Sequence, residues 1–577
     1  MIVEFILTYI SLDSHKKRFE YLSDSYKFLT DIVYIKYYIT EGILPNIIPH
    51  YLLLNYNITE DYYYSSLKQS LEEYRQEFST KFPKFSNPSI TLPQEYKDFT
   101  SKRNISIFTL SNKNQKIEQE PFFSAVNRMT TAIFYITSST NNKNITMDNK
   151  YSYELMLNLI NGYYISFETI TYIIFDDFKK TIKESSLNNI IIFIVSIFIS
   201  FLYLTIYWKM MAKLDIDREK PINLFLTIKK QIFENLKNSS ENFSNKLLNK
   251  FFGNEENEEE SQQQYRSNVT SSDINIAKFK ALNEYKASIN KKNSFLFYFI
   301  QLVIFYIICN IFLLAKYLNY IHYNNNIINF TKVYNSTQFA HIFLLGRVNI
   351  VRHFFFNESF TTLENIYGEN INNFIYCFLD MSGEFDNALK ETSKTDSFLK
   401  DDYKNLFIRY VYENFTELIL KDIEQNYEDY KAFLETIVDI EIGFKYISMQ
   451  IYESLRILMI KYIDNSQRNQ ALKNVSELLN DPNWIVVDLM IIYLAKPWYK
   501  NIIELMEIKY YSYIDKLKST NITVFAIVIS LITLNFWIIW KRFEDRYIDL
   551  IRKSFELINL IPEEIKNIIV HKLNEQN

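Results

Sequence analysis

Few residues of this chain have the type and spacing that catalysis or metal binding requires. His341 and His353 are close enough in sequence to share a helix, but they lie more than about three helical turns apart, so their side chains do not converge on one metal ion. H-E-x-x-H is also absent. We therefore predict no metal site. The 6 histidines and 2 cysteines are His15, His50, His322, His341, His353, His571, Cys309 and Cys377.

Glycine usage excludes the common phosphate-binding loops. The chain has 7 glycines in 577 residues, and their spacing fits neither G-x-G-x-x-G nor G-x-x-x-x-G-K-[ST], so the backbone cradles of those motifs cannot form. The two cysteines lie in different regions, which excludes a disulfide framework within either large domain. We predict no catalytic residues, no cofactor and no nucleic-acid partner, and hence a protein that is not an enzyme.

Three stretches without charged residues determine the class of the protein. They are residues 190–208, 295–315 and 522–540. At about 1.5 Å of rise per residue, a helix of this length crosses a hydrocarbon core of roughly 30 Å. The chain is thus predicted to be an integral membrane protein of the plasma membrane or an endomembrane, with the lipid bilayer as its first partner.

Three strongly polar side chains fall within these stretches. They are Gln301, Asn310 and Asn535. Amide side chains in lipid form hydrogen bonds between helices, each worth about 0.6–2 kcal/mol. We therefore expect Asn310 and Asn535 to pair across the second and third spans.

Basic residues beside the spans indicate the orientation, because Lys and Arg accumulate on the cytoplasmic side. Four precede the second span within fifteen residues and one follows it, whereas three precede the third span and five follow it. The first span gives a weaker contrast in the same direction. This pattern places residues 1–189 and 316–521 outside as two mainly helical domains, and residues 209–294 and 541–577 in the cytoplasm.

The cytoplasmic loop has two parts of different composition. Residues 222–252 form a basic amphipathic pattern, which fits a juxtamembrane helix that packs against its counterpart in 541–577, or one that binds an anionic leaflet or calmodulin. Residues 253–275 are acidic and polar and predict a disordered linker.

Apolar residues recur at helical spacing through most of the outer regions, and so predict an all-α protein with helical bundles or coiled coils. The exceptions are 105–110 and 131–136, which we interpret as short strands, and the Asn480–Asn483 segment, where Pro482 predicts a break. The helical predictions cover 151–185, 339–354, 363–380, 401–437 and 444–458.

The approaches to the first and third spans resemble each other and predict an internal duplication. Such a unit would begin with its own entering span, so the apolar residues 1–10 are interpreted as the end of a truncated span, with a poor signal sequence as the alternative. The matching elements are Glu154-Leu155-Met156 with Asp488-Leu489-Met490, Tyr163-Tyr164 with Trp498-Tyr499, Lys180 and Lys183 with Lys516 and Lys518, Trp208-Lys209 with Trp540-Lys541, and Leu226, Ile228, Ile232 and Leu236 with Leu560, Ile561, Ile565 and Ile569.

This repeat, with Leu560 to Ile565 after the last span, resembles the membrane regions of polytopic proteins of ciliates and amoebae related to the tiny macrocysts family. The resemblance covers about residues 150–577. Members of that family often join such domains to PAS sensor domains, so the resemblance implies a sensor-like membrane scaffold. This chain differs in having no PAS domain and in carrying Lys229 where the second copy has Pro562.

Three functions remain open: a receptor-like signalling scaffold, which we favour, a structural or adhesive surface glycoprotein, and an oligomeric channel or transporter subunit. A homo-oligomer or another membrane protein is the expected partner, and the sequence names no ligand. Glycosylation sequons do not separate the alternatives, because Asn238 and Asn268 place them in the cytoplasmic loop as well. The outer candidates are Asn57, Asn104, Asn144, Asn329, Asn335, Asn357, Asn414 and Asn474.

Overall fold

The computed structural model divides into two compact units, which we describe separately. The helical domain comprises Ile2–Asn189 and Asn319–Asn521, and the apolar unit comprises Ile190–Leu318 and Ile522–Asn577 together with Met1. The structure describes residues 2–47, 60–139 (except 103, 112 and 113), 149–227 (except 160 and 161), 292–355, 443–466 and 481–552 (except 543, 546 and 550), with a few isolated positions between these ranges.

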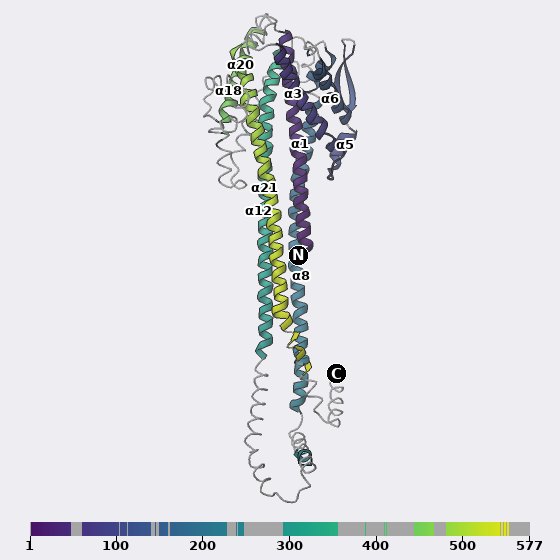
Figure 1. Cartoon of the computed structure of the whole chain (residues 1–577), viewed down its shortest axis with the longest axis vertical. Coiled ribbons are helices and arrows are strands. Elements are labelled where there is room, and N and C mark those ends of the chain that lie inside the picture. Colours follow the sequence, from purple (N-terminus) through teal and green to yellow (C-terminus); the bar gives the residue numbers. More distant parts are fainter. Residues whose placement is uncertain are drawn as a thin grey trace. The chain divides into compact units, whose positions relative to one another are not determined.

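The all-α prediction is confirmed, with one β-hairpin among the described residues (Figure 1). Helices α8, α12 and α21 are each long enough to hold a predicted span and part of the helical domain. In chain order the elements are α1 (Ile2–Ile47), α3 (Glu60–Lys81), α4 (Pro83–Ser86), α5 (Gln94–Lys102), β1 (Asn104–Ser111), β2 (Asn114–Pro121), α6 (Phe122–Ser138), α7 (Lys150–Asn158), α8 (Gly162–Thr227), α12 (Lys292–Phe355), α18 (Phe444–Ser466), α20 (Pro482–Met490), η4 (Ile491–Ala495), α21 (Lys496–Asn535) and η5 (Phe536–Lys541).

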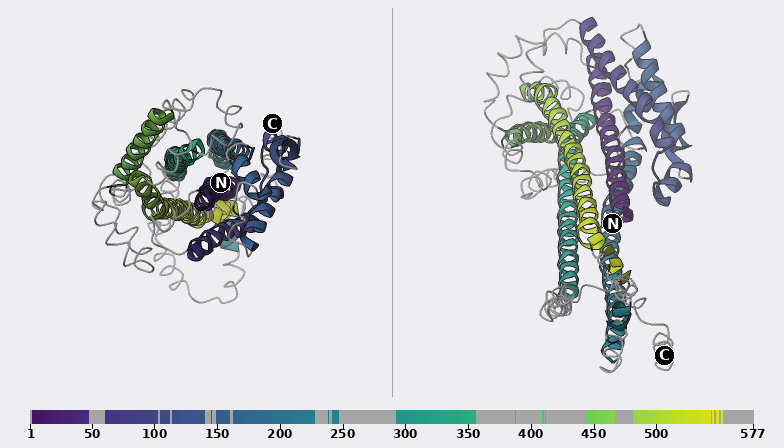
Figure 2. Two further views of the ribbon diagram at one scale, coloured as in Figure 1. Left: turned by 90° about the horizontal axis from the view of Figure 1, so that it is seen from above. Right: turned by 60° about the horizontal axis from the view of Figure 1, so that its bottom comes forward.

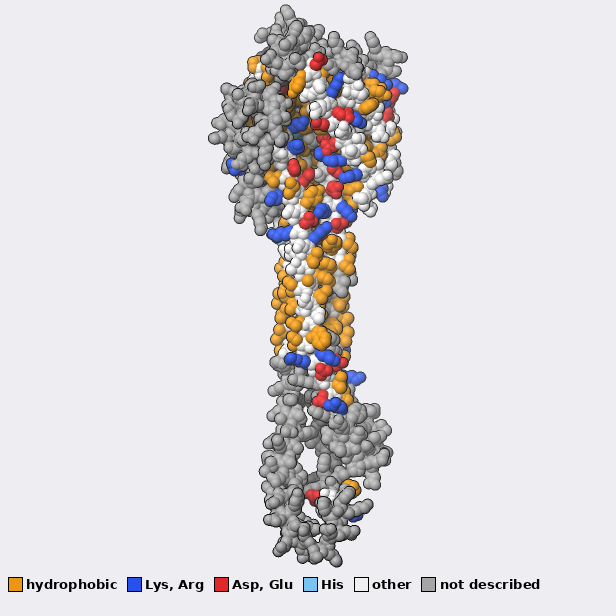
Figure 3. Space-filling view, viewed as in Figure 1, with side chains coloured by type: hydrophobic (Ala, Val, Ile, Leu, Met, Phe, Trp, Pro, Cys, Tyr) orange, Lys and Arg blue, Asp and Glu red, His pale blue; other side chains and the backbone are white. Residues whose placement is uncertain are grey.

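The apolar unit contains the predicted spans. Within the described residues, three helices are long and apolar enough to cross a membrane. In the most apolar 18-residue segment of each helix, only 6%, 6% and 11% of the segment is buried. On the face shown in Figure 3, this band carries many hydrophobic side chains and lies between two belts of charged ones. Phe193 stacks on Tyr317 with ring centroids 4.5 Å apart, and Trp208 lies 4.3 Å from Phe299, so aromatic contacts join α8 and α12.

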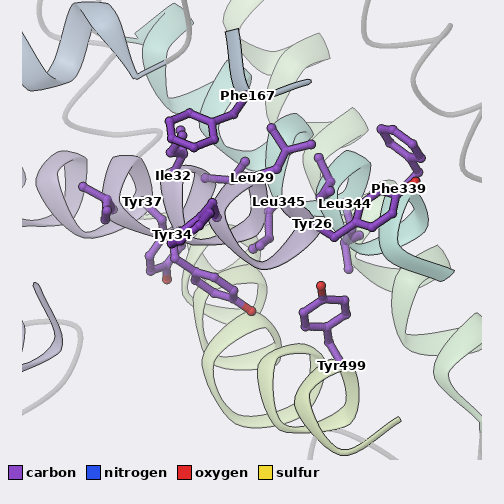
Figure 4. Close-up of a cluster of buried hydrophobic side chains, with 14 of the residues drawn as sticks. Tyr26, Leu29, Ile32, Tyr34, Tyr37, Phe167, Phe339, Leu344, Leu345 and Tyr499 are labelled. Atoms are coloured by element: carbon purple, nitrogen blue, oxygen red, sulfur yellow. The ribbon is translucent and has the colours of Figure 1, made fainter. Parts of the chain in front are cut away.

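In the helical domain, four long helices share one core. The ring of Phe19 on α1 is fully buried and lies 3.8 Å from Tyr510 of α21, 5.8 Å from Phe330 of α12 and 6.1 Å from Phe178 of α8. Helices α18 and α20 lie on one side of α1, and α3, α5 and α6 lie on the other (Figures 1 and 2). Further along α1 the core includes residues labelled in Figure 4, namely Tyr26, Leu29, Ile32, Tyr34, Tyr37, Phe167, Phe339, Leu344, Leu345 and Tyr499.

Of the two predicted strands, one is confirmed and one is wrong. Residues 105–110 lie in β1, which pairs antiparallel with β2 and buries Ile105 and Ile107 on one face. Residues 131–136 instead belong to α6. Their β-branched composition favours a strand, but buried Met129, Ile133 and Ile136 recur at helical spacing and form the inward face of a helix.

The predicted apolar face of α18 is confirmed, because Phe444, Ile447, Ile451, Leu455 and Leu458 are all fully buried. The predicted break at 480–483 is the start of α20. Several predicted segments lie outside the described residues. They are 253–275, 363–380 and 401–437, together with most of 228–252 and 553–577.

The two approach segments correspond element by element. Asn149 caps α7 by accepting hydrogen bonds from the backbone N–H groups of Tyr151 and Ser152, and Asp481 caps α20 by accepting one from Asn483. Each capped helix has 9 residues and is followed by a long helix, α8 or α21. The predicted match between the two segments therefore extends to their capping geometry.

Candidate functional site: a buried charge cluster and the start of α21

Three charged side chains from distant parts of the sequence meet inside the helical domain. They are Glu41 near the end of α1, Arg352 near the end of α12, and Asp488 in α20. The side chains of Arg352 and Asp488 are 0% exposed and that of Glu41 is 6% exposed. We call these three residues the charge cluster.

Arg352 is the centre of the charge cluster. One terminal nitrogen of its guanidinium, Nη2, forms ion pairs with both Glu41 and Asp488. Its Cζ lies 4.0 Å from the centre of the Tyr37 ring and 5.1 Å from that of Trp484, so the cation also faces two aromatic surfaces. The guanidinium thereby joins α1, α12 and α20 in one contact.

Hydroxyl groups complete the surroundings of the two carboxylates. Tyr37 donates a hydrogen bond to Oδ1 of Asp488 at 3.2 Å, and Tyr63 of α3 donates one to Oε2 of Glu41 at 2.7 Å. Burial raises the pKa of the Glu41 carboxyl to about 8; the Arg352 cation opposes this rise, and the neighbouring Asp488 adds to it. The raised pKa means that the Glu41 carboxyl holds its proton more tightly than a solvated glutamate does.

The π-helix η4 separates Asp488 from the first turn of α21, where Lys496 lies within an aromatic cage. The ammonium of Lys496 donates a hydrogen bond to the hydroxyl of Tyr38 at 2.9 Å. It also lies 5.3 Å from the centre of the Tyr34 ring, 5.2 Å from that of Tyr38 and 5.6 Å from that of Tyr74. Cation–π contacts with three rings fix this lysine against α1 and α3.

Two stacked pairs fix the next residues of α21. Trp498 stacks on Phe444 of α18 with ring centroids 3.6 Å apart, and Tyr499 stacks on His341 of α12 at 3.9 Å. Burial lowers the pKa of His341 to about 3, so its imidazole is neutral and forms a 2.8 Å hydrogen bond with the Tyr34 hydroxyl through Nε2. The first turn of α21 is thus held on several sides.

The chemistry of this site is that of a structural ion cluster. No group of three or more metal-ligating side chains occurs among the residues that the structure describes. His341 and His353 both lie in α12, and the His341 imidazole stacks on Tyr499 and forms a hydrogen bond with Tyr34. Sequence reasoning missed Glu41 and Arg352, because nothing in their local sequence marks them. Asp488 carried a signal, since it matches Glu154 in the repeat.

Glu154 forms the corresponding contact in the first approach segment. Its carboxylate accepts two hydrogen bonds from Arg128, at 2.9 and 3.1 Å. Arg128 also binds Glu118 and Glu120 of the hairpin. Both copies therefore pair a carboxylate of the capped helix with an arginine, although the arginines come from different elements.

The structure describes part of the surroundings of the three polar side chains within the spans. Asn310 donates from Nδ2 to the backbone carbonyl of Tyr306, at 2.8 Å, within its own helix. The Oδ1 atoms of Asn310 and Asn535 are buried and accept no hydrogen bond from the described residues. Gln301 is half-buried. The pairing of Asn310 with Asn535 stays a prediction.

The predicted glycosylation sites differ in their surroundings. Asn329 and Asn335 lie in the middle of α12, and Asn335 accepts a hydrogen bond from the buried Tyr26 hydroxyl. An acceptor asparagine normally lies in a surface loop, so α12 is a poor place for a sugar. Asn104 begins β1. The remaining candidates, Asn57, Asn144, Asn357, Asn414 and Asn474, lie outside the described residues.

In the part of the chain that the structure describes, the fold is that of an all-α protein with a four-helix core and three helices long and apolar enough to span a membrane. Comparisons with family models, with curated proteins and with solved structures find no match for this chain.

Proposed function

We propose that this chain is an integral membrane protein of the receptor-like or signalling-scaffold type, with no catalytic activity, whose helical domain lies outside the cytoplasm. The observation that supports this proposal is helix continuity. α8 buries Phe167, Ile174 and Ile182 in the helical core and continues without a break through the apolar residues 190–208. α12 and α21 likewise contain both core residues and an apolar stretch.

Continuity matters because an α-helix is stiff along its axis. A rotation or shift of a long helix in the helical domain is carried along the same hydrogen-bonded rod into its apolar stretch, as happens in helix-shift switches. A purely structural or adhesive protein does not need helices that run unbroken from the helical domain into the apolar stretches. Membrane insertion itself is supported by the exposed apolar side chains of the spans, which water would solvate poorly.

Disulfide locking tests the proposal in the full chain, with Cys309 and Cys377 replaced by serine. The lock is Ser11→Cys with Ser185→Cys, because these hydroxyl oxygens lie 2.5 Å apart and join α1 to α8. The reporter is the rate of crosslinking between Trp208→Cys and Phe299→Cys, whose rings are 4.3 Å apart in the apolar unit. If the chain is receptor-like, formation of the lock should change the rate of crosslinking between positions 208 and 299.

The control lock is Ser106→Cys with Gln119→Cys, which are opposite each other in the hairpin and join none of the long helices. This disulfide should leave the reporter rate unchanged. If the lock between α1 and α8 also leaves the rate unchanged, the signalling proposal is wrong and the structural alternative is favoured.

Glycan mapping tests the orientation separately. Sugar at Asn57 or Asn414, with none at Asn238, agrees with a helical domain outside the cytoplasm. Sugar at Asn238 alone would place the helical domain inside and contradict the proposal.

A further inference from the structure

The outward face of α1 changes from apolar to charged between Ile10 and Asp13. Before this change the exposed side chains include Ile6, Leu7 and Ile10, which are 48%, 43% and 57% exposed. After it they include Asp13 and Lys17, whose side chains are 41% and 53% exposed. The opposite face of the helix stays buried throughout. Its residues are Thr8, Leu12, His15 and Phe19.

The same change occurs on α8 and α21. Glu184 is the last charged residue of α8 before the stretch 190–208, and the apolar Leu187, 56% exposed, follows it directly on the surface. Lys518 is the last charged residue of α21 before the stretch 522–540. Each of the three helices therefore has a point at which charged residues end and an apolar surface begins.

Contacts within the helical domain bring these three points to the same level. Ser11 Oγ of α1 lies 2.5 Å from Ser185 Oγ of α8. Lys518 Nζ of α21 lies 2.9 Å from Asp13 Oδ1 and 5.2 Å from the centre of the Tyr9 ring, both on α1. The change on α1 is thus next to the changes on both neighbouring helices.

α1 runs antiparallel to α8 and α21. Phe19 packs against Phe178 of α8 and Tyr510 of α21, about two turns from the contacts at the change of composition. The residues of α1 before Ser11 therefore extend in the same direction as the residues of α8 after Ser185. Five residues correspond to about 7.5 Å along either helix, and on α8 this advance reaches the start of the charge-free stretch.

We infer that the first turns of α1, residues 5–10, are embedded in the leaflet that adjoins the helical domain, with lipid covering Ile6, Leu7 and Ile10. The inference rests on the membrane insertion in the proposed function, and it adds a fourth helix to the lipid-facing surface. Water solvates such exposed apolar side chains poorly, whereas lipid covers them. Tyr9 is 41% exposed at the change itself, where tyrosine is enriched at membrane–water interfaces.

Glu4 is compatible with this depth. It is the only charged residue among the first twelve, and a charged side chain is most costly at the bilayer centre. Glu4 precedes Ile10 by six residues, or about 9 Å along the helix. Half of the hydrocarbon core is about 15 Å thick, so Glu4 stays on the near side of the centre.

Nitroxide accessibility measures what covers this face. The full chain, with Cys309→Ser and Cys377→Ser, receives one cysteine, Ile6→Cys or Ile10→Cys, is labelled with a nitroxide and is reconstituted in phosphatidylcholine vesicles. Collision rates are measured with oxygen, which concentrates in lipid, and with a nickel chelate, which stays in water. The ratio of oxygen to nickel collisions should be higher at Ile6→Cys than at Ile10→Cys, because position 6 lies about 6 Å deeper.

Two further positions calibrate this ratio. Lys17→Cys lies on the same face of α1 beyond the change and should give the ratio of a site in water. Ile194→Cys, at a position 59% exposed in the charge-free part of α8, should give the ratio of a site in lipid. Both α1 positions should exceed Lys17→Cys several-fold. An unfolding temperature equal to that of the unlabelled chain shows that the fold is kept, and Leu7→Cys replaces any variant that does not fold.

Water-like ratios at both α1 positions, with a lipid-like ratio at Ile194→Cys, would overturn the inference alone. Low collision rates with both reagents at positions 6 and 10 would also overturn it, because they would indicate a second copy of the chain or another protein on this face. A ratio that falls from position 10 to position 6 would contradict the direction of insertion. If Ile194→Cys itself is water-like, membrane insertion fails, and the proposed function falls together with this inference.

Discussion

The two approach segments begin alike and differ at the joint that follows their capped helices. The first joint lies between α7 and Gly162, where α8 begins, and the second joint is η4, with Pro497 where the first copy has Gly162. Each precedes a long helix that contains an apolar stretch. The residues around each joint show how that joint is held.

The β-hairpin holds the first joint. The side chain of Asn158 accepts a hydrogen bond from the backbone N–H of Phe108 at 2.7 Å and donates one to its carbonyl at 2.8 Å. Gly162 lies so close to β1 that an added Cβ would be 2.8 Å from the carbonyl oxygen of Ser106. Contacts with the backbone of β1 therefore hold the first joint at Asn158 and at Gly162.

Side chains hold the second joint instead. The contacts on either side of η4 are the charge cluster, through Asp488, and the aromatic cage of Lys496. Such contacts depend on protonation and on side-chain position, whereas the hairpin contacts of the first joint depend on the backbone. The first joint is thus held by the backbone and the second by side chains, and four changes test this difference.

The largest effect should follow from Arg352→Met, which leaves Glu41 and Asp488 buried without their cation. Breaking a buried pair in this way typically costs about 3–5 kcal/mol, so we expect a large fall in the unfolding temperature of the purified full chain. Arg456→Met is the control, because Arg456 is 48% exposed and pairs with Glu453 on the surface of α18. Equal falls for the two variants would contradict a central role for Arg352.

Gly162→Ala should have the next largest effect. The new methyl group would meet the Ser106 carbonyl oxygen, which is backbone and cannot turn aside. Overpacking of this kind costs about 1–3 kcal/mol, again read from the unfolding temperature. The control is Ile165→Ala on the same helix, where the side chain is 50% exposed. A neutral Gly162→Ala would mean that the contact with β1 does not hold the first joint.

Lys496→Met should cost less, about 1 kcal/mol, because it removes the cation from the aromatic cage but keeps a flexible apolar chain among the rings. Lys500→Met, at an exposed position one turn later on α21, is the matched control and should be near neutral. A loss at position 500 as large as that at position 496 would show that the cage does not anchor α21.

The sequence predicted the elements better than the joints. Charge-free stretches and helical spacing identify the long helices and the face of α18, because burial of one face leaves a periodic pattern. The charge cluster left no such pattern: Glu41 and Arg352 look like solvated charges in their own helices, and only the tertiary fold brings them to Asp488. The π-turn before Pro497 was visible in principle, since a proline in the interior of a helical segment removes a backbone hydrogen bond and clashes with the preceding turn.

Glu41→Gln should have the smallest effect below about pH 4.5, because the Glu41 carboxyl is protonated there in both the folded and the unfolded chain, and glutamine resembles that protonated carboxyl. Its effect depends on pH. In the folded chain the pKa of Glu41 is raised from 4.5 to about 8, so between these values the folded state keeps a proton that the unfolded chain has lost. The wild-type contribution from Glu41 is therefore fully present below about pH 4.5 and is lost as pH rises towards 8.

Glutamine has no such proton, so the unfolding temperature of Glu41→Gln should rise relative to wild type across pH 4.5 to 8 and then stay at a constant difference. The comparison must be between the two chains, because the buried imidazoles of His15 and His341, with pKa values lowered to about 4 and 3, act in the opposite direction in both. The control is Glu453→Gln at an exposed position of α18, which should give a curve parallel to wild type in this range. Parallel curves for Glu41→Gln as well would mean that the second joint has no proton-dependent anchor, and the contrast with the first joint would then rest on the aromatic cage alone.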